Sequence, residues 1–512
     1  MPYGAEVAME IKSSDLISLF EKSLSQEPQT SLQETGIVVQ VGDGVCRVHG
    51  LENAVYNELI TFQGGNKGIV FDLEEQYVSV FLLYNSIVVA ELETVYRTGE
   101  VFKTPVGMHL LGRVINAIGE PIDGLGDLVV DDRVSVKASA PGVIERSPVN
   151  ESFETGILVI DALIPIGKGQ RELLIGNRGT GKTAIALDAI LNQKGKNVLC
   201  IFVSIGQRKA NLARIVRLLI ENGAMEYTVI VSADSSDSVL SQYLAPYVGS
   251  SIGEYFRSKG HDALIVYDDL TNHAIAYREM SLILRRPPGR EAFPGDVFYL
   301  HSQLLERAGK LASGGSLTAL PIIQVQADDI TAYIPTNLIS ITDGQIFLDD
   351  QMFKSGTRPA VNVGLSVSRV GGAAQTKAVK KMAKTLGLEL AQYRELLDFS
   401  QFGTDLDPIA QQRINKGQRA IEVLKQAQYV TYTFAQEALM LFMLQNDLLE
   451  EIDIAYVHTF VMQFVSYTES VYPKVYKTIL DTKDVSAETE QELKRIAQEF
   501  KTLFVAPDRT GF

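Results

Sequence analysis

Residues 176–183 read GNRGTGKT and form the strongest local signal in the sequence. It fits the pattern GxxxxGK(S/T) and joins a strand-like run, residues 171–175, to a helix-like run, residues 182–193. Glycine lets backbone N–H groups curl around a phosphate, and the helix N-terminus adds positive potential. The lysine neutralises phosphate charge, and the threonine hydroxyl completes a Mg²⁺ shell. The predicted phosphate-binding residues are Gly176, Asn177, Arg178, Gly179, Thr180, Gly181, Lys182 and Thr183.

An acidic pair follows an apolar run further along the chain. Residues 263–267 read as a strand and are followed by Asp268 and Asp269. In P-loop proteins, a carboxylate at the carboxyl end of a neighbouring strand holds Mg²⁺, directly or through water. We therefore expect Thr183 and Asp269 to hold Mg²⁺. Together the two elements predict binding of a Mg-nucleoside triphosphate, but they leave open whether the chain hydrolyses it.

Strand-like and helix-like runs alternate around the motif, through residues 198–205, 211–221 and 228–233. Continuous apolar strands between amphipathic helices indicate a parallel sheet covered on both faces. Upstream, short β-rich runs punctuated by glycine occupy residues 32–101, which favours a small β-barrel. After about Gly372 the β signal fades, and charged amphipathic patterns predict helices.

The predicted fold class is therefore a multidomain α/β protein. An amphipathic pattern at residues 16–24, with Ser14 as N-cap, predicts a terminal helix that packs on its own domain or docks on a partner. The predicted boundaries are residues 1–30 for this helical segment, 31–98 for the β-barrel domain, 99–372 for the nucleotide-binding domain and 373–512 for the C-terminal helical domain.

Composition excludes several classes of function. Of 512 residues, 46% are hydrophobic and 21% charged, which is ordinary for a globular protein. The net charge of −15 argues against nonspecific binding to nucleic acid or anionic lipid. No apolar run approaches the ~20 residues of a membrane span, so we expect no direct membrane insertion. Cys46 and Cys200, the two cysteines, stand in apolar runs typical of buried free thiols.

Long stretches on both sides of the P-loop resemble one family, the alpha subunits of F-type ATP synthases. Residues 141–190, beginning PGVIERSPVNESFETG, and residues 263–311, beginning ALIVYDDLTNHAIAYREM, carry the resemblance, as does RPAVNVGLSVSRVGGAAQTK at residues 358–377. The likeness runs from about residue 34 to about residue 430. It implies a β-barrel crown, a RecA-like central domain, a helical base, and ATP or ADP with Mg²⁺ as ligands.

The same resemblance implies partners and a location. Family members form a ring of three alpha and three beta subunits around a gamma shaft, and their N-terminal region meets the delta or oligomycin-sensitivity subunit of the peripheral stalk. The complex is peripheral on an energy-transducing membrane and couples ATP synthesis or hydrolysis to proton transport. That membrane is the bacterial plasma membrane, at its cytoplasmic face, or the mitochondrial inner membrane, at its matrix face.

The resemblance also assigns roles to single residues. Gln207 stands where the catalytic beta subunit carries a glutamate that polarises water, and an amide is no comparable base. From the residues alone, Asp268, Asp269 or Asp328 remain alternatives for that base. Arg369 matches the family's arginine finger, which acts in trans on the neighbouring subunit. The remaining nucleotide contacts implied by the family are Arg358, near the chain's own nucleotide, and Gln426 and Gln428, at the adenine pocket.

Two segments depart from the family pattern. The P-loop has Asn177 and Gly179 where Asp and Gln are usual, and Gln324 and Asp328 stand where Glu and Gly are usual. We therefore expect nucleotide retention, and coordination on the γ-phosphate side, to differ from the family pattern.

Three rival functions make different predictions. An independently active rotary or export-type hexameric ATPase predicts glutamate at position 207, and an RNA-translocating hexamer predicts a basic surface. A module that has lost its nucleotide predicts loss of residues such as Lys182. The sequence opposes all three.

Overall fold

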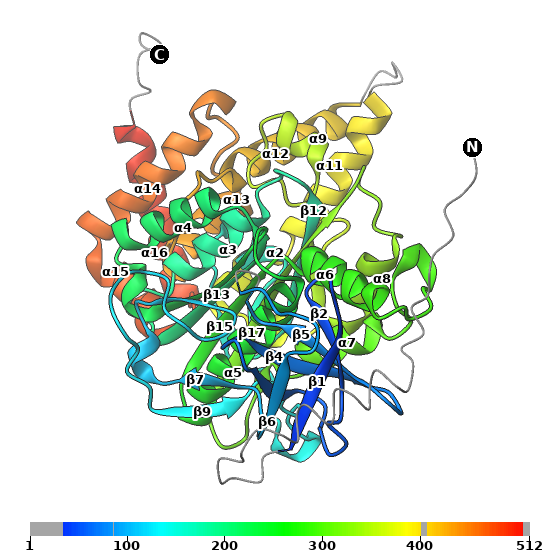
Figure 1. The fold of residues 1–512 in the computed structure, drawn as a ribbon. Helices are drawn as coiled ribbons and strands as arrows, with labels where there is room; N and C mark the ends of the chain where they lie inside the picture. Colours follow the sequence, from blue (N-terminus) through cyan, green and yellow to red (C-terminus); the bar gives the residue numbers. More distant parts are fainter. Residues whose placement is uncertain (1–33, 85–86, 401–406, 505–512) are drawn as a thin grey trace. The chain divides into compact units, whose positions relative to one another are not determined.

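The computed structural model describes residues 34–84, 87–400 and 407–504, which form two compact units (Figure 1). One unit holds the described residues up to Phe102 together with Ile283–Arg285, and the other holds the remaining described residues. The helix predicted at the N-terminus lies outside the described residues. Within them, no helix combines the length and apolar character needed to cross a membrane.

The first unit contains a closed barrel with the strand order β1-β2-β5-β4-β3-β6. Buried and partly exposed side chains alternate along β3, as expected for a strand with one face in a core. Glycine is required where strands approach closely: a Cβ at Gly68 would lie 2.5 Å from Val80 Cγ1. The strands are β1 Thr35–Gly42, β2 Val45–His49, β3 Glu58–Phe62, β4 Lys67–Leu73, β5 Val78–Leu82 and β6 Thr94–Val101.

The second unit is built on a nine-stranded sheet, which is parallel in its central part. Its strand order is β19-β18-β12-β17-β15-β13-β14-β8, with β16 paired to β17. The strands are β8 Val114–Asn116, β12 Glu172–Asn177, β13 Val198–Gln207, β14 Thr228–Asp234, β15 Asp262–Asp268, β16 Gly309–Lys310, β17 Ser316–Val325, β18 Gly344–Leu348 and β19 Val367–Ser368. Two short pairs stand apart from it, β7 Lys103–Val106 with β9 Asp132–Ser135 and β10 Ser152–Phe153 with β11 Ile166–Gly167.

Helices cover both faces of this sheet, because successive side chains of the buried strands point in opposite directions. On one face, Phe202 belongs to the same core as Ile185 of α3 and Leu219 of α4. On the other face, a Cβ at Gly249 of α5 would lie 2.4 Å from Val203. The helices of this domain are α2 Leu158–Leu163, α3 Lys182–Leu191, α4 Lys209–Glu221, α5 Val239–Ser258, α6 Leu270–Ile283, α7 Val297–Leu305, α8 Tyr333–Ile341 and α9 Asp350–Lys354.

The C-terminal part of the second unit is helical (Figure 1). Its central helix, α13, is almost entirely buried and shares one hydrophobic core with α2 and α3. The helices are α10 Lys377–Met382, α11 Leu386–Ser400, α12 Pro408–Leu424, α13 Phe434–Gln445, α14 Val457–Val471, α15 Pro473–Thr482 and α16 Ala487–Leu503.

The fold class predicted from the sequence is confirmed: a β-barrel precedes a parallel-sheet P-loop domain and a helical domain. The two cysteines are also as expected. Cys46 lies buried in the barrel and Cys200 lies buried in β13, and both are free thiols. Burial raises the pKa of Cys46 to about 12, so its thiol stays protonated and unreactive.

Candidate nucleotide-binding site

The P-loop follows β12 directly and ends at the N-terminus of α3. Gly176 has no room for a side chain, because a Cβ there would lie 2.6 Å from the carbonyl oxygen of Leu348. Gly179 and Gly181 have φ angles of 84° and 100°, in the left-handed region that favours glycine. Arg178 and Gly179 are exposed at the tip of the loop. The loop conformation therefore depends on glycine at these three positions.

Lys182 begins α3 and is buried. Its Nζ donates a hydrogen bond to the carbonyl oxygen of Gly176 at 2.8 Å. Burial lowers the pKa of Lys182 to about 8, and the negative charges of Asp269 and Asp268 oppose that shift. A bound phosphate would favour the protonated ammonium in the same way, since an opposite charge stabilises the charged form.

The two acidic residues at the end of β15 have different partners. Thr183 donates its hydroxyl hydrogen to Oδ2 of Asp268 at 3.0 Å. Asp269 instead accepts hydrogen bonds from the backbone N–H of Asn272 at 2.8 Å and from the side-chain amide of Gln324. The carboxylate beside Thr183 is thus that of Asp268, whereas the sequence predicted that Thr183 and Asp269 would hold Mg²⁺. Strand β15 is also not adjacent to β12, because β17 lies between them.

The Thr183–Asp268 pair fits a divalent cation. Hydroxyl and carboxylate oxygens are the hard ligands that Mg²⁺ prefers, and these two side chains already lie within hydrogen-bond distance. Burial, followed by the nearby charge of Asp269, raises the pKa of Asp268 to about 7. A cation at this point would relieve the repulsion between the two carboxylates and favour their ionised forms.

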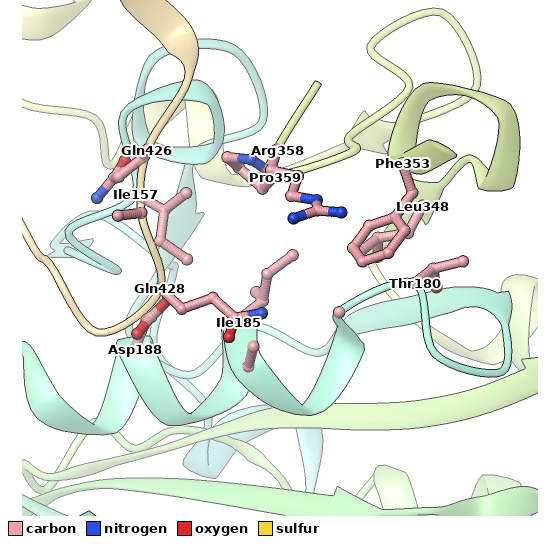
Figure 2. Close-up of a pocket in the computed structure, with 13 residues that line it drawn as sticks. Ile157, Thr180, Ile185, Asp188, Leu348, Phe353, Arg358, Pro359, Gln426 and Gln428 are labelled. Carbon is pink, nitrogen blue, oxygen red and sulfur yellow. The ribbon is translucent and has the colours of Figure 1, made fainter. Parts of the chain in front are cut away.

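A pocket opens beside the P-loop, over α3. Its empty volume is about 400 Å³, including the part open to solvent. On one wall the guanidinium of Arg358 lies over the ring of Phe353, 4.5 Å from its centroid, and Gln428 extends across α3 (Figure 2). The lining residues are Ile157, Thr180, Gly181, Ala184, Ile185, Asp188, Leu348, Phe353, Arg358, Pro359, Gln426, Ala427 and Gln428.

The two glutamines predicted for this pocket differ in what their side chains do. Gln428 is exposed at the pocket, with its amide available to a ligand. The amide of Gln426 is buried and bonded to the backbone: its nitrogen donates to the carbonyls of Gly156 and Val430, and its oxygen accepts from Leu158. Gln426 therefore shapes the pocket through its loop rather than by offering a polar group.

Asp188 was not predicted from the sequence, although it is a buried carboxyl group on the α3 side of the same pocket. Its one sequence signal is a charged residue inside the apolar helical run AIALDAIL, six residues after Lys182. Phe353 was missed as well, because an aromatic residue in a short helix gives no sign that it supports an arginine.

Two of the residues that depart from the family pattern, Asn177 and Asp328, contact each other beside the P-loop. The side-chain oxygen of Asn177 accepts a hydrogen bond from the backbone N–H of Asp328 at 3.0 Å, while its carbonyl accepts one from the hydroxyl of Thr180 at 2.9 Å. Asp328 adopts a left-handed φ of 57°. Burial and the charges of Asp349 and Asp350 raise its pKa. Two departures, at positions 177 and 328, are thus direct neighbours.

Gln207 lies at the end of β13, at the same edge of the sheet as the P-loop. In the register of β13 with β15, Ser204 is opposite Asp268, so Gln207 extends beyond the acidic pair. Its side-chain oxygen is 3.5 Å from the amide nitrogen of Asn211, which is at most a weak hydrogen bond.

Arg369 lies near the start of β18, at the end of the sheet opposite the P-loop. It directly follows β19, whose Ser368 is paired with Gly344 at the start of β18. Its guanidinium donates to the carbonyl oxygens of Thr342 at 3.1 Å and Ile339 at 3.4 Å, at the C-terminus of α8, where a cation is favoured by the helix dipole. The residue is exposed. The structure thus does not bring Arg369 to the P-loop of its own chain.

Comparison with known proteins identifies the family. Residues 31–99 match the beta-barrel domain of the ATP synthase alpha/beta family, residues 156–368 match its nucleotide-binding domain, and residues 375–500 match its C-terminal domain. The three matches follow the order of the domains in the structure.

Full-length relatives agree. The chain is 51% identical over 502 residues to ATP synthase subunit alpha of Caldanaerobacter subterraneus subsp. tengcongensis, covering 97% of this chain and 99% of the relative. It is 50% identical to the subunit of the same name from Wolinella succinogenes, covering 97% and 100%, and 50% identical to that from Clostridium botulinum, covering 97% and 99%. A chain with this domain order, this P-loop and these relatives belongs to the ATP synthase alpha/beta family, as one of its alpha subunits.

Proposed function

We propose that this chain is the regulatory, non-catalytic nucleotide-binding subunit of an F-type ATP synthase. It binds Mg-ATP or Mg-ADP in its own P-loop and supplies Arg369 to the catalytic site of an adjacent beta subunit. The position of Arg369 carries the proposal, because an exposed guanidinium at the sheet edge opposite the P-loop serves a neighbouring site better than its own.

In the chain's own site, the backbone N–H groups of residues 179–183 and the ammonium of Lys182 bind the phosphates. Thr183 and Asp268 hold Mg²⁺, directly or through water, and Asp269 adds negative charge beside them. When bound, the cation neutralises phosphate charge. Arg358 and Gln428 orient the nucleoside in the adjoining pocket.

The absence of turnover follows from Gln207. A neutral amide hydrogen-bonds water but does not remove its proton, so the site lacks a general base at that position. Two other carboxyl groups at this edge, those of Asp268 and Asp269, are bonded to Thr183, Asn272 and Gln324, and they are buried.

The assembly that this function requires is an alternating ring with beta subunits around a gamma shaft. The N-terminal region would attach the ring to the delta or oligomycin-sensitivity subunit of the peripheral stalk. We place the complex peripherally on an energy-transducing membrane, where it couples nucleotide chemistry to proton transport. Support comes from the three relatives, each named ATP synthase subunit alpha.

The purified chain provides the test. It should bind Mg-ATP in equilibrium dialysis and release no more phosphate than Lys182→Ala, a variant that removes the phosphate-binding ammonium. Multiple turnovers by the chain without a partner, abolished in Lys182→Ala, would instead support an independently active ATPase.

A further inference from the structure

The segment between α12 and α13 passes over the pocket beside the P-loop, which we call the base-side pocket. Both ends of the segment are bonded to the P-loop domain. At one end, the backbone N–H of Gln426 donates to the carbonyl of Arg358 at 2.9 Å, and its side-chain amide donates to Gly156 at 2.7 Å. At the other end, the N–H of Tyr432 donates to the same carbonyl of Gly156 at 3.0 Å. Between these anchors, Ala427 and Gln428 are exposed at the pocket.

The middle of the segment has one further attachment. The backbone N–H of Tyr429 donates to Oδ1 of Asp188 on α3 at 2.8 Å. Tyr429 has a left-handed φ of 66°, a conformation that is unfavourable for a residue with a side chain. A hydrogen bond to a carboxylate is about twice as strong as one to a neutral acceptor. The Asp188 carboxylate therefore stabilises the turn that directs Gln428 toward the pocket.

The backbone N–H of Tyr429 is the main electrostatic partner of the Asp188 carboxyl group. Burial raises the pKa of Asp188 to about 7, and the N–H of Tyr429 opposes the shift. Among the residues that line the pocket, the other charged side chain is Arg358, on the wall near Phe353. Asp188 is thus a buried carboxyl group whose ionised form is favoured by one backbone N–H.

We propose that Asp188 is a positioning residue for the bound nucleotide: its carboxylate holds the 427–429 turn over the base-side pocket, so that Gln428 retains the base. The inference rests on the proposed function, in which the nucleoside occupies this pocket. It adds a determinant of retention on the P-loop helix itself, connecting that helix to the C-terminal domain.

The test measures release of radiolabelled Mg-ATP from the full chain. Asp188→Ala should release nucleotide about tenfold faster, since a hydrogen bond to a charged group is lost. Asp188→Asn keeps an acceptor for Tyr429 and should recover most of the retention. Asp481→Ala, which removes an exposed carboxylate on α15, is the matched control and should release at the parent rate.

A pH series separates positioning from a general loss of structure. Release should slow more steeply as pH rises from 6 to 8 in the parent chain than in Asp188→Asn, because ionised Asp188 is the stronger acceptor. Asp268 and Lys182, which also titrate in this range, contribute equally to both slopes. If Asp188→Ala does not fold, this comparison alone decides. Equal pH slopes in the parent and Asp188→Asn, or parent-like release from folded Asp188→Ala, would overturn the inference. If Lys182→Ala binds Mg-ATP as the parent does, the proposed function fails instead.

Discussion

Arg369 and Lys182 lie at opposite ends of the same parallel sheet. Lys182 follows β12, whose Gly176 is paired with Leu348 at the end of β18, whereas Arg369 follows Ser368, which is paired with Gly344 at the beginning of β18. With a rise of about 3.3 Å per residue, Gly344 and Leu348 lie roughly 13 Å apart along β18. A phosphate held by Lys182 is therefore at the opposite end of β18 from Arg369, whose side chain is exposed.

The different partners of the two aspartates predict different phenotypes. Asp268→Asn should weaken Mg-ATP binding about tenfold and leave ATP binding in EDTA nearly unchanged, because only the cation contact is lost. Asp269→Asn should mainly lower the melting temperature, since the acceptors for Asn272 and Gln324 are disturbed. Titration with and without Mg²⁺, alongside thermal melts, checks both. Equal Mg²⁺ sensitivity in the two variants would remove the distinction drawn from the geometry.

Replacement of Gly179 separates a side-chain effect from backbone strain. No atom lies within 4 Å of a Cβ built there, but the φ of 84° is unfavourable for any side chain. Gly179→Ala should therefore cost roughly 1 kcal/mol of loop stability and speed nucleotide release. Gly179→Gln carries the same strain and adds a donor near the phosphates, so it should release nucleotide more slowly than Gly179→Ala. Identical dissociation rates in the parent and both variants would show that this position is silent.

A buried carboxyl group makes stability depend on pH. Glu437 of α13 is buried near the carboxyl group of Asp161. Burial, together with the nearby charge of Asp161, raises its pKa well above the ordinary value. The folded state thus keeps a proton that the unfolded chain loses above about pH 4.5, so stability falls as pH rises toward the folded pKa.

Replacing this group by its neutral isostere should remove that dependence. Glu437→Gln should be more stable than the parent at pH 8, and the advantage should shrink by at most about 1.4 kcal/mol per pH unit on going down to pH 5. Denaturant unfolding at several pH values measures it. Parallel stability curves for the two proteins would contradict the assignment. An exposed control, Glu488→Gln at the start of α16, should show no comparable change in slope.

Much of this architecture could be predicted from the sequence, since the signals were local. The glycines of the P-loop, the apolar runs of β13 to β15 and the shift to amphipathic helices after Gly372 each depend on residues close together in the chain. The choice between Asp268 and Asp269 depended instead on the direction of side chains at a strand end and on the insertion of β17 between β12 and β15. Neither the side-chain direction nor the strand order can be predicted from a local sequence pattern.

The roles of Gln426 and Asp188 were hidden for a related reason. Their partners, Gly156 and Tyr429, are 270 and 241 residues away in sequence, so only the packing of the C-terminal domain on the P-loop domain brings them together. The contact between Asn177 and Asp328 spans 151 residues in the same way. Long-range hydrogen bonds of this kind follow from tertiary structure and leave no periodic signal in the chain.

If Arg369 acts on the nucleotide of a neighbouring beta subunit, its replacement should be felt in the multi-site ATPase activity of a reconstituted alpha–beta–gamma complex. Arg369→Ala should assemble normally by gel filtration and bind nucleotide at its own P-loop, yet lose on the order of 10³-fold in steady-state hydrolysis. Arg369→Lys should recover little, because an ammonium does not reproduce the planar guanidinium. Near-normal turnover by a correctly assembled Arg369→Ala complex would rule out a role in trans and leave Arg369 as a cap on the C-terminus of α8.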